Sequence, residues 1–376
     1  MKKGWQTKPF EDCIESVKYT RKIQRKDFLD DGQFPIVSQE ADFTNGYWDD
    51  EADVFKVSTP VVIFGDHTQV LKYVDFDFVL GADGVKILPP RDFLRPKFFF
   101  YQLQAANFTS LGYARHYRLL KELEIKYPPL AEQQRIVGLL DEAFEGLATA
   151  KANAEKNLQN ARALFESHLQ SVFADQWKTG ELVTLTDLAT DITDGDHLPP
   201  PKSPTGVPFI TIGNIVKETR EIDFSDTFMV PRAYFDALKP YKKPRQGDVL
   251  YTVTGSFGIP VIVRDDTEFC FQRHIGLVRP KPETSSSWLY YLLMSPQLLK
   301  QANDGATGTA QKTVSLKLLR SFVVPKVSPK HQKQAVEKLD ALSEETQRLA
   351  RLYERKQAAL EALKKSLLHQ SSTGEL

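Results

Sequence analysis

The feature that most constrains the fold is an internal repeat that runs through the whole chain. The segment from Pro128 to Asp141 returns as the segment from Pro325 to Asp340. The offset between the copies is 199 positions, and it is 197 upstream of a two-residue insertion. Leading segments match as well, since "GQFPIVS" resembles "GVPFITIGN". A repeat on this scale determines the architecture before any local motif does. The sequence therefore predicts a first unit, a long helix, a second unit similar to the first, and a second long helix.

Both copies of the repeat lead into a long helix with coiled-coil spacing. Each helix starts shortly after a proline, which is a common helix start. Apolar and small residues then recur at steps of three and four, which predicts a stripe that packs on a partner helix. From about Ala131 to Val172, the first helix would span roughly 60 Å at ~1.5 Å per residue. The predicted stripe consists of Leu140, Ala143, Leu147, Ala150, Ala154, Asn157, Ala161 and Leu164 in the first helix and of Leu339, Leu342, Thr346, Leu349, Tyr353, Lys356, Leu360, Leu363 and Leu367 in the second.

The long helices can pair with each other in antiparallel orientation, or each can pack on its own unit as an ordinary amphipathic helix. The alanines of the first stripe favour pairing, because small side chains let a partner backbone approach closely. Asn157 is expected to face Lys356 in such a pair. The predicted fold class is α+β: two similar mixed α/β domains separated by two long helices that pair as an antiparallel coiled coil, with an internal pseudo-twofold repeat.

The two units are expected to be mixed domains rich in strands. Runs such as "PVVIFGDH" and "GDVLYTVTGSFGIPVIVRD" are apolar or alternating and are bounded by Gly, Asp and Pro, which is typical of strands and turns. "FLRPKFFFYQLQAANF" and "SSSWLYYLLMSPQLLKQA" are each expected to form a helix that closes a unit. The expected organisation is a first domain over 1–126, a helical spacer over 127–174, a second domain over 175–325 and a helical spacer over 326–376.

Composition places the chain among ordinary globular proteins. Its 49 Lys and Arg residues balance 49 Asp and Glu residues, so no basic excess points to nucleic acid. No apolar run of 18 residues is present, and the start "MKKGWQTKPFEDC" lacks the apolar core of a signal peptide. A cytoplasmic location without membrane contact is therefore expected. Cys13 and Cys270 lack the spacing of a disulfide framework or a zinc site, so both are expected to be buried thiols.

The sequence carries no motif for catalysis or cofactor binding. It has no GxxxxGK[ST] loop, no GxGxxG that opens a helix and no HExxH pattern. The nearest candidate, "GATGTAQKT" from Gly305, has the wrong spacing for a phosphate-binding loop. Scattered acidic residues on a neutral protein are more often solvated than bound to metal. No catalytic constellation is therefore evident in the sequence, and no metal site is expected.

Loops rich in small, polar and cationic residues recur at the predicted strand ends. "TDGDHLPPPKSPTG", "TGSFG", "FQRHIG" and "ATGTAQKTVS" lie in the second unit, and "VSQEADFTNGYWDD", "FGDHTQ" and "SLGYARHYR" take matching places in the first. Such side chains hydrogen-bond base edges and phosphates, and recognition usually lies on loops of a rigid scaffold. Turn formation alone also selects Gly, Asp, Asn and Ser, so a structural role stays open. Basic clusters at Lys18 to Lys26 and Lys239 to Arg245 are either contacts or solvated surface.

Four of these segments together resemble the DNA-specificity subunit of Type I restriction-modification systems. They are "PPLAEQQRIVGLLD", its second copy "PKVSPKHQKQAVEKLD", "FGDHTQVLKYVDFDFVLGADGVKIL" and "LGYARHYRLLKELEI". The resemblance covers the whole chain, and the step from proline through "EQ" into the helix is its most specific part. The second copy departs from the first, since it carries "KHQ" from Lys330 where the first carries "AEQ" from Ala131. The two helix starts are therefore not equivalent.

This resemblance implies two target recognition domains and two helical spacers in one polypeptide. It implies a bipartite double-stranded DNA target, with one half read by each domain. Half-sites about one helical turn apart, ~34–36 Å, need a reader of fixed spacing, and the paired helices would supply it. It also implies two methyltransferase subunits that use S-adenosylmethionine to methylate adenine, and restriction subunits that use ATP and Mg. The chain itself would be non-catalytic, in agreement with the missing motifs, and would hold no cofactor.

The loops and the resemblance together give a set of candidate residues. Gln133, Gln134 and Arg135, on the first helix outside the stripe, are candidates for docking the methyltransferase. Two other classes stay open: a catalytic endonuclease or methyltransferase, which would cut DNA or bind a cofactor alone, and a protein scaffold, which would be indifferent to DNA sequence. The candidate DNA contacts are His67, Arg115 and His116 in the first unit and Lys202, Thr254, Ser256, Arg273, Gln311 and Lys312 in the second.

Overall fold

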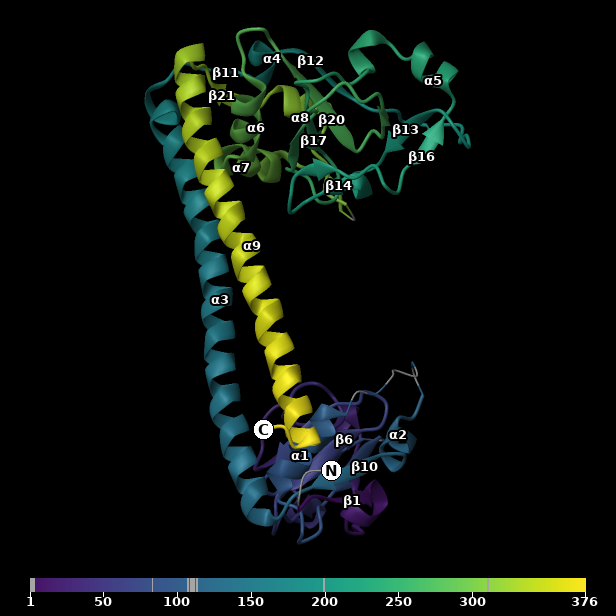
Figure 1. Ribbon diagram of the computed structural model, residues 1–376. Helices are drawn as coiled ribbons and strands as arrows, with labels where there is room; N and C mark the ends of the chain where they lie inside the picture. The colour runs from purple at the N-terminus through teal and green to yellow at the C-terminus, as the bar shows by residue number, and fades with distance from the viewer. Residues whose placement is uncertain are drawn as a thin grey trace. The chain divides into compact units, whose positions relative to one another are not determined.

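The chain forms two compact units. One consists of Met1–Lys156 with Tyr353–Leu376, and the other consists of Asn157–Leu352. Each unit therefore contains one globular domain together with a part of both long helices (Figure 1). No helix within the described part of the chain is long and apolar enough to cross a membrane. The computed structural model describes residues 4–82, 84–106, 108, 112, 114–198, 200–309 and 311–376.

Both predicted long helices are present. Helix α3 spans Leu130–Thr179 and helix α9 spans Pro329–Thr373. Helix α3 continues past Val172, where the sequence predicted its end, because its last turns pack into the second domain. Phe173 is fully buried there, and its ring centre lies 6.2 Å from that of Trp288.

Contacts between the long helices show that they run antiparallel, as the repeat predicts. In the first unit, Lys151 Nζ lies 2.8 Å from a carboxylate oxygen of Glu361. Nearby, Lys364 Nζ lies 5.4 Å from the centre of the Phe144 ring. These contacts join the early part of α3 to the late part of α9. An exposed ion pair contributes only about 0–1 kcal/mol, so the buried stripe supplies most of the stabilisation.

The buried stripe follows the prediction as far as Ala154 on α3. Beyond it, the neighbouring residues replace Asn157 and Leu164 on the stripe, whereas Ala161 is buried as predicted. Ala154 is 1% exposed, and Leu158 and Phe165 are half-buried on the stripe. The reason is the helical period: an α-helix drifts by about 20° per heptad relative to a strict 3.5-residue repeat, and a one-residue shift restores contact. The same shift occurs in α9. The four residues that the spacing placed wrongly on the stripe, all of them exposed, are Asn157, Leu164, Lys356 and Leu363.

The first domain consists of small sheets covered by short helices. A five-stranded sheet has the order β2-β8-β3-β4, with β5 also paired to β8, and a three-stranded sheet has the order β7-β6-β9. Helix α1 packs against β6 and β7, and the pair β1-β10 leads into α3 (Figure 1). The elements are β1 (Gln6–Pro9), β2 (Lys22–Ile23), β3 (Phe34–Val37), β4 (Tyr47–Trp48), β5 (Val54–Phe55), β6 (Val61–Gly65), β7 (Leu71–Val74), β8 (Phe78–Gly81), β9 (Val85–Leu88), α1 (Pro96–Ala105), α2 (Tyr117–Lys121) and β10 (Glu124–Tyr127).

The second domain has the same plan with additions. A four-stranded sheet has the order β12-β20-β17-β18, a three-stranded sheet has the order β16-β13-β19, and β14 and β15 form a hairpin. The pair β11-β21 leads into α9. The elements are β11 (Leu182–Thr184), α4 (Leu185–Leu188), β12 (Ala189–Asp194), β13 (Val207–Ile210), β14 (Ile215–Val216), β15 (Glu221–Ile222), β16 (Phe228–Val230), α5 (Arg232–Ala237), β17 (Val249–Thr252), β18 (Pro260–Ile262), β19 (Cys270–Phe271), β20 (Ile275–Pro280), α6 (Ser286–Met294), α7 (Pro296–Gly305), α8 (Leu316–Arg320) and β21 (Val323–Pro325).

The strand pairings confirm that the domains are copies of one frame. In the first domain, β3 pairs in parallel with β8 and antiparallel with β4, and in the second β13 pairs in parallel with β19 and antiparallel with β16. Strand β6 lies between β7 and β9, as β17 lies between β18 and β20, with every pairing antiparallel. The pseudo-twofold repeat in the sequence is therefore a repeat of hydrogen-bond pattern.

One predicted helix of the second domain is in fact two helices. The segment "SSSWLYYLLMSPQLLKQA" was expected to form a single helix, but α6 ends before Ser295 and α7 begins at Pro296. The Ser295 side chain accepts a hydrogen bond from the Leu298 N–H at 3.4 Å and caps α7. Proline is well suited to the first position of a helix and disfavours a helical residue before it, which explains the break.

The first turns of each long helix belong to the core of a globular domain. In the first unit, Ile136 and Leu140 of α3 are buried with Phe98 of α1. In the second unit, Leu339 of α9 is buried with Trp288 of α6. Full burial of a large apolar side chain contributes about 1.5–3 kcal/mol. Each long helix is thus anchored to the domain that precedes it in the chain.

Both cysteines are buried thiols, as the sequence predicts. Cys13 and Cys270 are 0% exposed and form no disulfide. Burial raises the pKa of Cys13 to about 11 and the pKa of Cys270 to about 12. The thiolate is the reactive form, so neither side chain acts as a nucleophile at neutral pH.

Two neighbouring substitutions on α3 test the shifted stripe. The Phe165 ring lies 6.4 Å from that of Tyr291, centre to centre, whereas Leu164 is 50% exposed. Phe165→Ala is expected to lower the free energy of unfolding by about 2 kcal/mol, because it removes a packed ring. Leu164→Ala is expected to change it by less than about 0.5 kcal/mol. Urea denaturation followed by circular dichroism measures both changes. A larger loss of unfolding free energy for Leu164→Ala than for Phe165→Ala would show that Leu164, as the spacing predicted, lies on the buried stripe.

Candidate nucleic-acid interface

Three adjoining hollows lie on the second domain, around the ends of β17, β19 and β20. Their volumes are about 620, 460 and 350 Å³. His274 lines all three, and Thr254, Arg273 and Gln311 each line two. Concave surfaces with converging polar groups are the usual sites of ligand recognition. Loops that are far apart in the sequence thus meet at one place.

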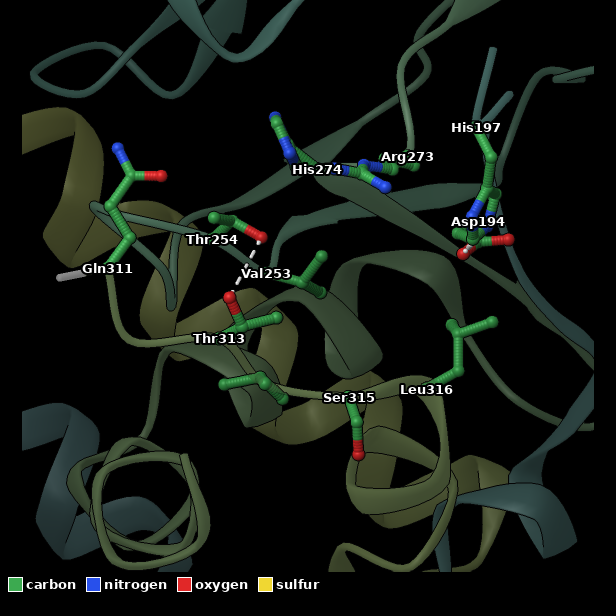
Figure 2. A pocket seen from close by; sticks show the side chains of 11 residues that line it. Asp194, His197, Val253, Thr254, Arg273, His274, Gln311, Thr313, Ser315 and Leu316 are labelled. Carbon is green, nitrogen blue, oxygen red and sulfur yellow. Dashed lines mark hydrogen bonds and ion pairs between the residues drawn. The ribbon is translucent and has the colours of Figure 1, made fainter. Parts of the chain in front are cut away.

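The largest of these three hollows has both donors and acceptors on its walls (Figure 2). The Thr313 hydroxyl donates to the Thr254 hydroxyl at 3.4 Å, and Thr254 is only 9% exposed. His197 Nε2 lies 2.8 Å from a carboxylate oxygen of Asp194. Arg273 is exposed among these groups. Base edges in the major groove also present mixed donors and acceptors, so this surface is chemically suited to them.

The two smaller hollows share lining residues with this one and extend the surface. Lys202 lines one of them, and its Nζ lies 5.0 Å from the centre of the Phe228 ring, where a cation–π contact orients the ammonium group. Ser256 and Lys217 line the other. The Ser256 carbonyl accepts a hydrogen bond from the Thr252 hydroxyl at 2.9 Å, which holds the turn after β17 in place.

The structure brings together the residues predicted for the second domain. Lys202, Thr254, Ser256, Arg273 and Gln311 all line the three hollows. Lys312, the remaining one, is exposed next to Gln311. Their contact with DNA stays a prediction.

Sequence reasoning missed His274, although this residue is common to all three hollows. The signal was available, because His274 follows Arg273 directly in "FQRHIG". Burial, and then the positive charge of Arg273, lower the pKa of His274 below its usual value. The lowered pKa favours the neutral form of the ring, which offers one donor and one acceptor. A neutral imidazole is suited to a base edge rather than to a phosphate charge.

The three residues predicted to contact DNA in the first domain differ in their exposure to solvent. His67 is half-buried just after β6, and Arg115 is exposed before α2. His116 is only 1% exposed; its backbone N–H donates to the Asp66 carbonyl at 2.7 Å, and its Nδ1 lies 3.0 Å from the same oxygen. The prediction that His116 contacts DNA is wrong, because its ring is buried where α2 joins the end of β6. His67 and Arg115 remain predictions.

Another hollow, of about 360 Å³, lies on the first domain and contains none of the residues predicted there. It combines Arg25, from the first basic cluster, with residues of the loop between β3 and β4. In the second basic cluster, by contrast, Lys242 Nζ lies 3.5 Å from Asp196, which indicates a structural role. The residues that line the hollow of the first domain are Arg25, Phe28, Leu29, Asp30, Thr44, Asn45, Gly46 and Tyr47.

A buried lysine holds the loop of that hollow. Lys72 is 3% exposed, and its Nζ donates to the Asp42 carbonyl at 2.5 Å and to Asn45 Oδ1 at 3.2 Å. Burial lowers the pKa of Lys72 to about 8. Sequence reasoning missed this residue. The alternation along β7 could have shown it, because Lys72 shares the inward face with Val74.

The residues predicted to dock a partner on α3 differ in exposure. Gln133 is 0% exposed, and both polar atoms of its side chain are hydrogen-bonded to backbone groups. The prediction that Gln133 docks a partner is therefore wrong. Gln134 and Arg135 are exposed, and Arg135 forms a bidentate pair with Glu132, which raises the pKa of the guanidinium. These two remain candidates for docking.

The duplicated frame and the polar hollows of the second domain are the features of a two-domain recognition protein. The chain belongs to the family of Type I restriction modification DNA specificity domains, whose model matches residues 2–158 and 176–357. Its role is that of a DNA-specificity subunit, and catalysis belongs to partner subunits of such systems. Neither alternative, a catalytic nuclease or methyltransferase and a protein scaffold, gains support from this membership.

Individual relatives agree with the family. The Type I restriction enzyme EcoBI specificity subunit of Escherichia coli is 22% identical over an aligned length of 376, and the match covers 86% of this chain and 78% of that protein. The EcoR124I/EcoR124II specificity subunit of Escherichia coli is 28% identical over 177 residues, 43% of each chain.

Solved structures share the fold. A chain from a structural study of assembly and conformational transition in the type I R-M system has a TM-score of 0.74 at 20% identity and covers 100% of this chain and 99% of that one. The HsdS subunit of Thermoanaerobacter tengcongensis has a TM-score of 0.57 at 20% identity, with 100% and 98% covered.

The electrostatic coupling of Arg273 and His274 is open to a direct test. Arg273→Ala removes a positive charge beside the imidazole, so the pKa of His274 is expected to rise towards its usual value. The rise is partial, because burial, the larger cause, remains. Titration of the His274 ring signals by NMR measures the change in the free protein. An unchanged or lower pKa would show that the two side chains are not coupled.

Proposed function

We propose that the chain recognises a bipartite DNA sequence, with one half read by each globular domain and the long helices fixing the distance between the halves. The observation that carries this proposal is the set of three hollows that meet at His274. They present cationic, amide, hydroxyl and imidazole groups on one concave surface. Half-sites about 34–36 Å apart require a reader whose parts are held at a fixed separation.

The duplication supports reading of two different halves. Backbone hydrogen bonds identify equivalent positions: the Asp66 N–H donates to the Gly84 carbonyl at 2.7 Å, as the Val253 N–H donates to the His274 carbonyl at 2.9 Å. The following residues, His67 and Thr254, therefore occupy the same place in the frame with different side chains. A shared frame with different loops favours an asymmetric split target.

Individual contacts follow from the chemistry of the side chains. Arg273 and Lys312 would contact guanine edges or phosphates, and Gln311 is suited to the paired donor and acceptor of adenine. The hydroxyls of Thr254 and Ser256 would accept or donate at base edges or phosphates. Lys202 extends the surface, and His67 and Arg115 are the counterparts in the first domain.

The exposed faces of the long helices would dock two methyltransferase subunits. Gln134 and Arg135, which are exposed on α3, would contact one of the two. Those subunits would use S-adenosylmethionine to methylate adenine, and restriction subunits with ATP and Mg would join the same complex. This chain carries 49 basic and 49 acidic side chains. Its partners would therefore supply many of the phosphate contacts.

Substitution of Arg273 tests the proposed contacts of the second domain. In the complex with its methyltransferase, Arg273→Ala is expected to weaken binding of target DNA by about 10-fold to 100-fold, because a bidentate pair with guanine is worth about 1–3 kcal/mol. It should also relax base preference at one position of one half-site only. Competition binding with DNA variants that each change one position measures both effects.

Lys300→Ala is the matched control for loss of a surface cation. Lys300 lies on α7, its side chain is 74% exposed, and it pairs with Asp304 at 2.6 Å. This variant should bind target DNA as the unsubstituted chain does. A folded Arg273→Ala variant with unchanged affinity and unchanged base preference would contradict the proposed role of the hollows.

Salt dependence tests the division of phosphate contacts between the chain and its partners. The logarithm of the binding constant falls with the logarithm of salt concentration by about 0.9 per neutralised phosphate. The isolated chain is expected to show a slope of about 3 or less in magnitude, and its complex with methyltransferase a slope steeper by several units. A steep slope for the isolated chain would contradict this division.

A further inference from the structure

The first long helix meets its domain at a buried glutamine. Gln133 Nε2 donates to the carbonyls of Phe93 and Pro128 at 2.9 and 2.8 Å, and its Oε1 accepts from the Arg95 N–H at 2.8 Å. Arg95 is the N-cap residue of α1. One fully buried amide therefore ties three backbone segments together: the start of α3, the chain just before it, and the start of α1. We call this arrangement the first joint.

The second long helix repeats the arrangement. Gln332 is 3% exposed, its Nε2 donates to the carbonyls of Glu283 and Val327 at 3.3 and 2.8 Å, and its Oε1 accepts from the Ser285 N–H at 2.8 Å. Ser285 is the N-cap residue of α6, the counterpart of α1. This second joint makes the same three bonds to equivalent backbone positions.

A carboxylate two helical turns further on braces each joint. Asp141 of α3 accepts a hydrogen bond from the Tyr101 hydroxyl and lies 2.8 Å from Lys97 Nζ. Asp340 of α9 accepts from the Tyr291 hydroxyl at 2.6 Å. Each long helix is therefore attached by polar bonds at two levels to the helix that closes its domain.

These bonds restrain the direction of the helix in a way that the surrounding core does not. Apolar contact is non-directional, so the core anchors the helix but selects its direction less sharply than oriented hydrogen bonds do. Hydrogen bonds weaken steeply with misalignment, and a buried amide that loses its partners has no water to replace them. A swing of either helix would break several bonds at once.

A small swing would matter for DNA. Twenty residues of helix span about 30 Å, so a swing of about 10° displaces the far end by about 5 Å. The rise of one base pair is ~3.4 Å. Discrimination between spacers that differ by one base pair therefore requires restraint at the joint that is finer than about 10°.

We propose that Gln133 and Gln332, braced by Asp141 and Asp340, are positioning residues that set the number of base pairs allowed between the two half-sites. They do so by fixing the direction in which each long helix leaves its domain. The inference rests on the proposed function, since it presupposes a split target. Loss of a joint is expected to broaden spacer tolerance and to leave the sequence of each half-site unchanged, which a loss of DNA contacts would not do.

The test uses the full chain in complex with its methyltransferase. Gln133→Met and Gln332→Met keep the size of the side chain and remove the three hydrogen bonds of one joint. Methylation rates are measured on DNA with native half-sites and a spacer of native length, one base pair longer, or one base pair shorter. The ratio of the native rate to the shifted rates is expected to fall about tenfold, since small displacements of reacting groups have large effects on rate. The rate on the native spacer should change by less than about threefold.

Gln159→Met is the matched control, because Gln159 lies on the same helix and is exposed. Its spacer ratio should equal that of the unsubstituted chain. If the glutamine variants do not fold, Tyr101→Phe and Tyr291→Phe decide the question, since each removes one hydroxyl from a brace and should lower the same ratio. Folded variants with an unchanged ratio would overturn the inference.

The same experiment separates this inference from the proposed function. If the unsubstituted complex shows no requirement for a split target, the proposed function fails and the inference fails with it. If the unsubstituted complex requires a fixed spacer and the variants require it equally, only the role of the joints fails.

Discussion

A primary amide buried where each long helix meets its domain is the interaction on which the arrangement of helix and domain depends. Gln133 and Gln332 are buried amides whose side chains are hydrogen-bonded to backbone groups of three segments. Unpaired buried groups of this kind cost about 1–3 kcal/mol each. With these groups satisfied, apolar residues such as Ile136 and Leu339 can close the cores around the joints.

The same frame supports two different surfaces. Short strands paired in the same pattern hold the loops of both domains, and the side chains on those loops differ between the domains. The paired strands stabilise each domain, and the loops carry the side chains for recognition. A substitution in a loop can therefore change recognition, because it leaves the strand ladder intact. In the second domain the loops form hollows around His274. In the first domain they form a hollow whose loop is held by Lys72.

Much of the fold could be predicted from the sequence, because periodicity and duplication are local or directly visible signals. The repeat gave the order of domains and helices, and the helix starts followed from their prolines. The stripe between the helices was wrong in places because 3.5-residue spacing drifts on a real helix. The proline at position 296 marked a helix break that the apolar run concealed.

The site was harder to predict, since polarity does not reveal whether a side chain is exposed. His116 and Gln133 have polar side chains typical of a surface, yet their partners are backbone groups distant in sequence, such as the Asp66 and Phe93 carbonyls. His274 was overlooked because the hollows form only when loops around residues 197, 254, 273 and 311 converge.

The most direct test of the central claim is a genome-wide map of adenine methylation in cells that express this chain with its methyltransferase, compared with cells that lack the chain. We expect methylation at one split motif with a fixed spacer, lost when the chain is absent; methylation that is unchanged without the chain, or confined to a continuous motif, would contradict a two-domain reader of a bipartite target.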